Sequence, residues 1–250
     1  MEDIFYRFAL KDENEWNEFF FQNGFVVISN ILSKENCDNL YSACAKHANE
    51  DFAAIHSIER DPPEGYGVKE VWDVMCNRAI INILDTLKTS QVGVVGSQIL
   101  FKKAGTRYAD QAWNPHQDNS YPQTCRGAYT TTNIFLEDAD PENGGLYIYP
   151  GSHREPLLPF VPTESFREKK GANPGNTVEV PSKYKKVDLY VKKGDMLVLH
   201  GHCIHGSYLN KSNRSRPLFS ANYVPRGELF ISGRNSKRKF REVRPPEEIE

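Results

Sequence analysis

The order of hydrophobic and polar residues divides the chain into a helical flank followed by a β-rich core. Residues 13–21 and 71–87 show helical patterns, and residues 25–28 form a short, β-branched apolar run that is typical of a strand. Ser33 is placed to cap a further helix, whose apolar face is formed at helical spacing by Cys37, Leu40, Tyr41 and Cys44. We therefore expect the first third to be mainly helical, with one strand.

From about residue 92 the pattern changes to short β-type runs. Strand signals, separated by clusters of Gly, Pro, Asn and Asp, occur at 92–101, 126–137, 145–149, 186–191, 195–200, 203–208 and 217–224. Many short strands predict a sandwich or a barrel. The Pro- and Gly-containing segment 154–185 is too long for a simple connection, so we interpret it as a candidate lid or binding loop.

We expect one domain over residues 1–250, with a helical flank (about 1–90), a β core (about 91–225) and a basic C-terminal tail (about 226–250). Single all-β domains often reach this length. Six basic residues lie between positions 234 and 244. We expect the tail to be a solvated surface segment, and an anion-binding arm is the alternative.

Composition narrows the class of protein. With 31 Lys and Arg against 33 Asp and Glu, the net charge is -2, so nothing supports nucleic acid as a partner. No apolar run approaches the roughly 20 residues of a membrane span, and the acidic N-terminus is unlike a signal peptide, so we expect a cytoplasmic protein. The five cysteines are scattered and form no CxxC pair, which predicts reduced thiols.

The first candidate chemistry is a set of metal-ligating residues. His116 and Asp118 stand at i and i+2, which on an extended strand point to one face and can bind one metal ion. His200, His202 and His205 follow later, and one of them can supply a third ligand. Two histidines and a carboxylate leave three positions open, as in non-haem Fe(II) oxygenases, and catalytic zinc is the rival.

A candidate anion-binding residue follows the histidines. Arg216 stands eleven residues after His205. The arginine fork matches a carboxylate, so a strand-borne arginine beside an iron site can hold the distal carboxylate of a dicarboxylate cosubstrate. A structural salt bridge is the alternative.

Several motifs in fixed order carry a resemblance to a known family. The set resembles the phytanoyl-CoA dioxygenase-like Fe(II)/2-oxoglutarate oxygenases over about residues 20–225, on the residues His116-x-Asp118, Glu142-Asn-Gly-Gly-Leu-Tyr-Ile-Tyr-Pro-Gly-Ser-His153, Gly194-Asp195, His205-Gly-Ser207 and Arg216. The resemblance implies a mainly β fold, a double-stranded β-helix or jelly roll, with N-terminal helices packed on its outside.

The resemblance also implies roles for individual residues. His116, Asp118 and His205 are expected to be the iron ligands, and His205 is chosen because it opens the His-Gly-Ser element. Arg216 is expected to clamp the distal carboxylate of 2-oxoglutarate, with Ser207 as its hydrogen-bonding helper.

Four further expectations concern the surroundings of that site. Arg214 competes with Arg216 for the clamp, but the eleven-residue spacing favours Arg216. Gln98 and Asn133 are expected to line the cosubstrate pocket. Three further histidines, His153, His200 and His202, are expected to have structural or supporting roles.

The implied function is hydroxylation of an unactivated C–H bond of a small metabolite or natural-product intermediate. Fe(II), 2-oxoglutarate and O₂ would be required, and succinate and CO₂ released. The carboxylate of Asp118 favours hydroxylation over halogenation, because related halogenases use the vacated position for chloride. An acyl-CoA hydroxylase of the same family, a non-catalytic jelly-roll binding protein and a zinc or manganese enzyme of cupin type are the alternatives.

Overall fold

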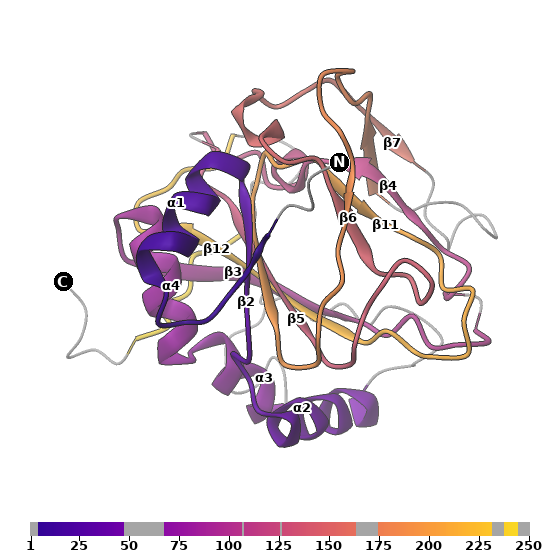
Figure 1. Ribbon diagram of the computed structural model, residues 1–250. Helices are drawn as coiled ribbons and strands as arrows, with labels where there is room; N and C mark the ends of the chain where they lie inside the picture. The colour runs from indigo at the N-terminus through magenta and orange to yellow at the C-terminus, as the bar shows by residue number, and fades with distance from the viewer. Residues whose placement is uncertain are drawn as a thin grey trace.

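The computed structural model describes residues 5–47, 68–106, 108–125, 127–163, 175–231 and 238–244. Its centre is two facing β-sheets (Figure 1). The larger sheet has the order β1 (Arg7–Phe8), β2 (Phe25–Ile28), β10 (Met196–His200), β5 (Thr130–Phe135), β12 (Leu218–Pro225) and β3 (Val92–Leu100). The smaller has the order β4 (Trp113–His116), β11 (His205–Ser207), β6 (Leu146–Ile148) and β9 (Val187–Asp188). Neighbouring strands are distant in sequence, which confirms the predicted double-stranded β-helix.

Both faces of the larger sheet are buried. Phe25 and Val27 of β2 pack into the core between the sheets, whereas the alternate residues Val26 and Ile28 pack into the core beneath the helices. Because each face buries apolar side chains, a one-residue slip in register would exchange the two sets, which fixes the pairing of these strands.

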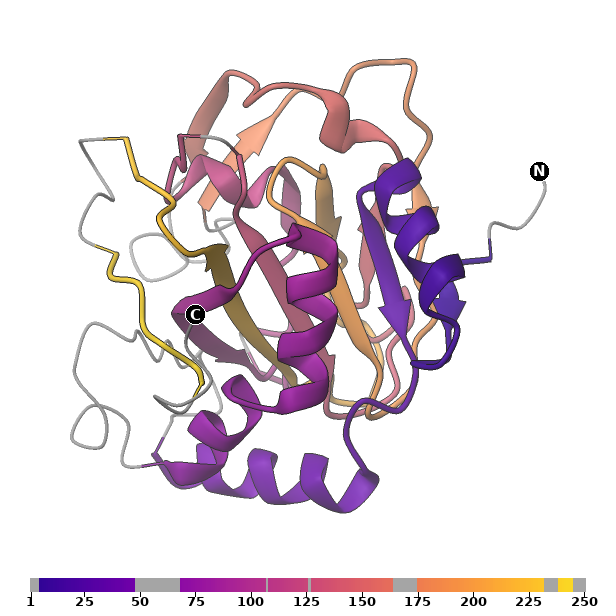
Figure 2. The ribbon, with the colours of Figure 1, turned by 90° about the vertical axis from the view of Figure 1, so that its left-hand side faces the viewer.

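The helices of the described residues lie over the outer face of the larger sheet and along one end of it (Figure 2). They are α1 (Glu13–Asn23), α2 (Lys34–His47), α3 (Lys69–Met75) and α4 (Arg78–Lys88). Ser33 caps α2 as predicted, with its Oγ accepting from the Asn36 backbone N–H at 3.1 Å. The prediction of one helix over 71–87 was wrong, because the Asn77 side chain accepts from the backbone N–H groups of Ala79 and Ile80 and starts a new helix there.

The segment 154–185 contains more regular structure than a loop. Strands β7 (Phe160–Thr163) and β8 (Gly175–Val178) pair with each other, and neither was predicted. The Tyr121 hydroxyl accepts from the Asn176 backbone N–H at 3.0 Å, which ties β8 to the segment that carries the HxD motif. The part of the candidate lid at 164–174 lies outside the described residues.

The C-terminal tail is docked on the edge of the larger sheet. Arg241 and Val94 of β3 exchange two backbone hydrogen bonds of 2.9 and 3.0 Å. The ring of Phe240 covers Gly93, where a Cβ atom would lie only 2.3 Å from the ring. Residues 238–244 thus form a surface segment that runs along the sheet edge, with Val243 buried and Lys239 exposed. In the described part of the chain, every helix is too short or too polar to cross a bilayer.

Candidate active site

Three strand and helix ends bring the predicted metal ligands together. His116 is the last residue of β4, and His205 is the first residue of β11, directly opposite it in the antiparallel pair. Asp118 begins a short 3-10 helix, η1 (Asp118–Ser120), rather than continuing the strand. The expectation that the HxD pair shares a strand face was wrong, yet the turn into η1 aims the carboxylate at the two imidazoles.

The three side chains form a compact ligand set. The Asp118 Oδ1 atom lies 3.3 Å from His116 Nε2 and 3.6 Å from His205 Nε2. One ligand atom from each residue lies within 4.8 Å of the other two. Two imidazoles and one carboxylate at this spacing can share a single cation, with room left for further ligands.

Backbone carbonyls fix the orientation of both imidazoles. His116 Nδ1 lies 2.8 Å from the Asn114 carbonyl oxygen, and His205 Nδ1 lies 3.0 Å from that of Cys203. A carbonyl only accepts, so each Nδ1 carries the proton and each Nε2 offers its lone pair to the shared point. Burial lowers the pKa of His205 to about 4, although Asp118 opposes this shift, so the ring is neutral near pH 7 as metal binding requires.

The carboxylate of Asp118 is held by a chain of hydrogen bonds. The Thr131 hydroxyl donates to Asp118 Oδ2 at 2.5 Å, and the Asn222 amide donates to that hydroxyl oxygen at 3.1 Å. Burial alone would raise the pKa of Asp118, but the two imidazoles and Thr131 stabilise the carboxylate and hold its pKa below the usual value. Asp118 is therefore an anion with one oxygen left for a metal.

A cavity of about 470 Å³ opens beside these ligands. Residues that were predicted for the cosubstrate pocket, Gln98, Asn133, Ser207 and Arg216, all line it. Its floor consists of cross-strand rows on β3, β12 and β5, namely Gln98, Ser220 and Asn133 in one row and Gly96, Asn222 and Thr131 in the next.

Arg216 is the buried cation at one end of this cavity. Only 1% of the residue is exposed, and its Nε donates to the Gly144 carbonyl at 3.0 Å. Its Nη1 is buried and has no hydrogen-bond partner among the described residues. A buried guanidinium with an unused donor beside a metal-ligand set fits the carboxylate of a cosubstrate such as 2-oxoglutarate.

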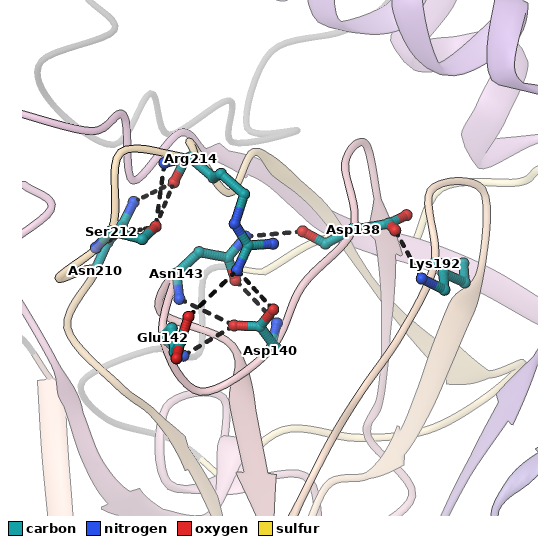
Figure 3. A network of polar contacts seen from close by, with 8 residues as sticks. All are labelled: Asp138, Asp140, Glu142, Asn143, Lys192, Asn210, Ser212 and Arg214. Atoms are coloured by element: carbon teal, nitrogen blue, oxygen red, sulfur yellow. Dashed lines mark hydrogen bonds and ion pairs between the residues drawn. The ribbon is translucent and has the colours of Figure 1, made fainter.

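Arg214 lies outside the cavity and is already paired. Its Nη2 lies 2.7 Å from Asp140 Oδ2 in a surface network (Figure 3). The loop from Asp138 to Asn143, which contains Asp140, leads directly into Gly144. The positive φ of Gly144, +87°, turns its carbonyl toward Arg216. A Cβ at Gly144 would lie 2.9 Å from Lys102 Cδ, so both its conformation and its surroundings require glycine.

Lys102 is a member of the site that sequence analysis missed. It is fully buried, and its Nζ donates to Ser207 Oγ at 2.9 Å and to the Tyr208 carbonyl. Burial and the nearby Arg216 lower its pKa well below the usual value. Nothing in the local sequence pattern around Lys102 predicted that it would be buried.

His153, His200 and His202 are not among the residues that line the cavity. His202 Nε2 lies 3.0 Å from the Asn119 amide nitrogen, next in sequence to Asp118, and His153 Nε2 contacts the Phe21 carbonyl at 3.1 Å. The rings of His200 and His202 are 5.6 Å apart. These contacts are those of supporting residues that fix the loops around the ligand set.

Comparison with known proteins decides the family. The sequence profile of the phytanoyl-CoA dioxygenase family matches residues 20–218. The chain belongs to the phytanoyl-CoA dioxygenase family. It is therefore an Fe(II)- and 2-oxoglutarate-dependent oxygenase that uses O₂, as the motifs predicted.

Curated relatives agree with this assignment. Phytanoyl-CoA dioxygenase 1 of Oryza sativa subsp. japonica is 28% identical over 222 residues, covering 87% of this chain and 73% of the rice protein. A phytanoyl-CoA dioxygenase of Arabidopsis thaliana is 37% identical over 118 residues, covering 44% of this chain and 38% of that protein. The matched segment is thus less than half of the Arabidopsis relative.

Solved structures share the fold of this phytanoyl-CoA dioxygenase family member at low identity. The non-haem α-ketoglutarate-dependent epimerase SnoN from nogalamycin biosynthesis gives a TM-score of 0.70 at 17% identity, over 88% of this chain and 85% of its own. The carbocyclase SnoK from the same biosynthesis gives 0.67 at 19% identity, over 92% and 94%. Both likenesses concern the fold.

Proposed function

We propose that this oxygenase hydroxylates an unactivated C–H bond of a small metabolite or natural-product intermediate. In this proposal His116, Asp118 and His205 hold Fe(II), and Arg216, with Ser207, holds the distal carboxylate of 2-oxoglutarate. Bound Fe(II) and 2-oxoglutarate together activate O₂ for C–H cleavage, with release of succinate and CO₂. A cytoplasmic location remains a prediction.

The protein's own contribution is position and exclusion of water. The Nδ1–H bonds to Asn114 and Cys203 hold both imidazoles in the metal-binding tautomer, and Thr131 holds the carboxylate. Gln98 and Asn133 offer amide groups to the cosubstrate from the floor of the cavity. Trp113 and Tyr121 line the cavity beside His116 and limit the access of water to the reacting centre.

The observation that carries the proposal is the unused donor of Arg216. A buried guanidinium nitrogen without a partner costs free energy, on the order of 1–3 kcal/mol, which an incoming carboxylate would recover. In the same cavity three ligand atoms converge. A binding site for a metal and a site for an organic anion are thereby joined in one enclosure.

The size of the cavity supports a small substrate. About 470 Å³ must hold both 2-oxoglutarate and the group that is hydroxylated. An acyl-CoA, the substrate class in the names of several relatives, would have to leave its nucleotide portion outside this space. The acyl-CoA alternative therefore predicts a substrate that enters only by its acyl end.

Succinate formation tests the proposal. Purified protein with Fe(II), 2-oxoglutarate and air should release succinate, and each of the three additions should be required. His116→Ala should abolish the release, whereas Asp38→Asn, which changes an exposed surface carboxylate, should retain it. If 2-oxoglutarate binds but no succinate is released with any substrate tested, the protein is a binding protein. Activity without 2-oxoglutarate or O₂ would indicate the zinc or manganese enzyme.

A further inference from the structure

The docked tail supplies a second positive end to the cavity. Arg238 and Lys239 line the same cavity as the metal ligands and Arg216. The far end from Arg216, called the Arg238 end here, is formed by Gly96, Tyr129, Asn222, Arg238 and Lys239. The end at Leu100, Ser207, Arg216 and Leu218 is called the Arg216 end.

The register of the sheet separates the two ends. Leu218 and Asn222 lie four residues apart on β12, which corresponds to about 13 Å along the strand. A Cβ built at Gly96 would lie 3.4 Å from Arg238 Nη1 and 3.5 Å from Asn222 Oδ1, so the guanidinium sits over this row of the floor. Asn222 is linked through Thr131 to Asp118, so the Arg238 end adjoins the ligand set.

Arg238 differs from Arg226 and Arg244 in its hydrogen-bond partner, which is not a carboxylate. Arg226 pairs with Glu242, and Arg244 pairs with Asp85. Arg238 instead donates to the Tyr129 hydroxyl at 2.9 Å and lies 5.7 Å from the centre of that ring. Within the described part of the chain, no carboxylate forms an ion pair with Arg238 or Lys239.

We propose that Arg238, assisted by Lys239, binds an anionic group of the primary substrate, either a carboxylate or a phosphate. The inference rests on the proposed function, because it takes the Arg216 end to be filled by 2-oxoglutarate. A cation that is half-buried, aimed into a cavity and paired only with a phenol is a ready site for an anion. The substrate is then a small organic anion that is fixed at its charged end next to the metal.

The arrangement also explains how two anions share one cavity. 2-Oxoglutarate extends from the ligand set toward Arg216, and the substrate anion lies on the other side, against Arg238. The floor between the ends is uncharged, with amides and hydroxyls from Gln98, Asn133 and Ser220. Each anion would thus have its own cation.

Three probes with the same six-carbon chain test whether the cavity prefers an anionic ligand to a neutral one. Hexanoate, hexyl phosphate and hexanol are titrated into the anaerobic Fe(II)·2-oxoglutarate holoenzyme, and binding is followed by the change in tryptophan fluorescence, of which Trp113 in the cavity lining contributes a part. At least one anion should bind about tenfold or more tightly than hexanol, and the preferred anion distinguishes a carboxylate from a phosphate substrate. If neither anion binds more tightly than hexanol, the proposal is wrong.

Variants then assign the preference to Arg238. Arg238→Gln should remove the anion preference, Arg238→Lys should keep much of it, and Lys239→Gln should reduce it by a smaller factor. Arg214→Gln is the matched control, because Arg214 pairs with Asp140 on the surface, away from the tail, and does not line the cavity. An unchanged anion preference in Arg238→Gln, with the thermal transition intact, contradicts the assignment.

The design separates this inference from the proposed function. If 2-oxoglutarate does not bind to the iron-loaded protein, the proposed function is wrong, regardless of the affinities of the three probes. If 2-oxoglutarate binds normally and the anions show no preference that depends on Arg238, only the inference fails. Arg238→Gln should leave the affinity for 2-oxoglutarate within about twofold of the wild type, since Arg216 holds that anion.

Discussion

The two ends of the cavity are built in different ways. At the Arg216 end, the cation belongs to the core, its Nε is fixed by the Gly144 carbonyl, and the adjacent Lys102 is fully buried. At the Arg238 end, the cation comes from a tail docked on the edge strand β3 and is held by one phenol. The first end is buried in the core, whereas the second depends on the docking of a surface segment.

This difference suggests a division of roles. A cosubstrate that is the same in every reaction of the family suits a binding site fixed by core strands. A substrate that differs between enzymes suits a binding site on a segment that can change without disturbing the core. Substitutions at each end should therefore affect different ligands.

The largest effect is expected on metal binding, from a substitution of Thr131, which lies between the two ends of the cavity. Thr131→Val removes the hydroxyl that donates to Asp118 and accepts from Asn222. We expect the affinity for Fe(II) to fall about 10–100-fold, as is typical when a group that orients a metal ligand is lost. Metal titration followed by succinate release measures this. Thr132→Val on the same strand is the control, because Thr132 donates to the Ala221 carbonyl instead.

A smaller effect is expected from Lys102 at the Arg216 end. Lys102→Met keeps the length of the side chain but removes the Nζ hydrogen bonds to Ser207 and Tyr208. We expect the dissociation constant of 2-oxoglutarate to rise by up to about tenfold, because Ser207, the expected helper of Arg216, loses the donor that orients it, and such a hydrogen bond is worth about 0.5–1.5 kcal/mol. The neighbouring exposed Lys103→Met is the control, and equal effects of both variants would place Lys102 outside the site.

The smallest effect is expected from undocking the tail. A Cβ at Gly93 would lie 2.3 Å from the Phe240 ring and 2.6 Å from the Arg241 carbonyl, so Gly93→Ala should displace residues 238–244. We expect binding of the anionic probes to weaken several-fold, by less than the loss of a whole charge-assisted pair, while 2-oxoglutarate binds as before. Faster tryptic cleavage at Lys239 and Arg241 would report undocking. Weakened 2-oxoglutarate binding would show that the two ends are not independent.

Much of the Arg216 end was accessible from the sequence because its residues stand at fixed spacing in motifs. His116, Asp118, His205 and Arg216 were named from those motifs, and the structure brings all four to one cavity. Their assigned roles remain proposals. Most strands of the core were located because apolar runs alternate with turn residues, but β1 and β4 were not among the predicted ranges.

Other features depend on contacts between distant segments and could not be predicted. Lys102 is buried because its Nζ meets Ser207 and Tyr208, more than 100 positions away. Arg238 reaches the cavity because the tail pairs with Val94. The break between α3 and α4, by contrast, had a local signal in Asn77, a residue type that favours helix N-caps, which the apolar pattern of 71–87 obscured.

The most direct test of the account is the affinity for 2-oxoglutarate in a pair of arginine variants. Anaerobic protein with Fe(II) is titrated with 2-oxoglutarate, and the weak visible charge-transfer band of the chelated cosubstrate is followed. Arg216→Ala should raise the dissociation constant at least about 30-fold, because loss of one partner of a buried charge pair costs about 2–5 kcal/mol. Arg214→Ala, two residues away on the surface, should leave it unchanged. Equal affinities in the two variants, or no band in the wild type with iron bound, would contradict the central claim that Arg216 and the His116, Asp118 and His205 set form one cosubstrate site.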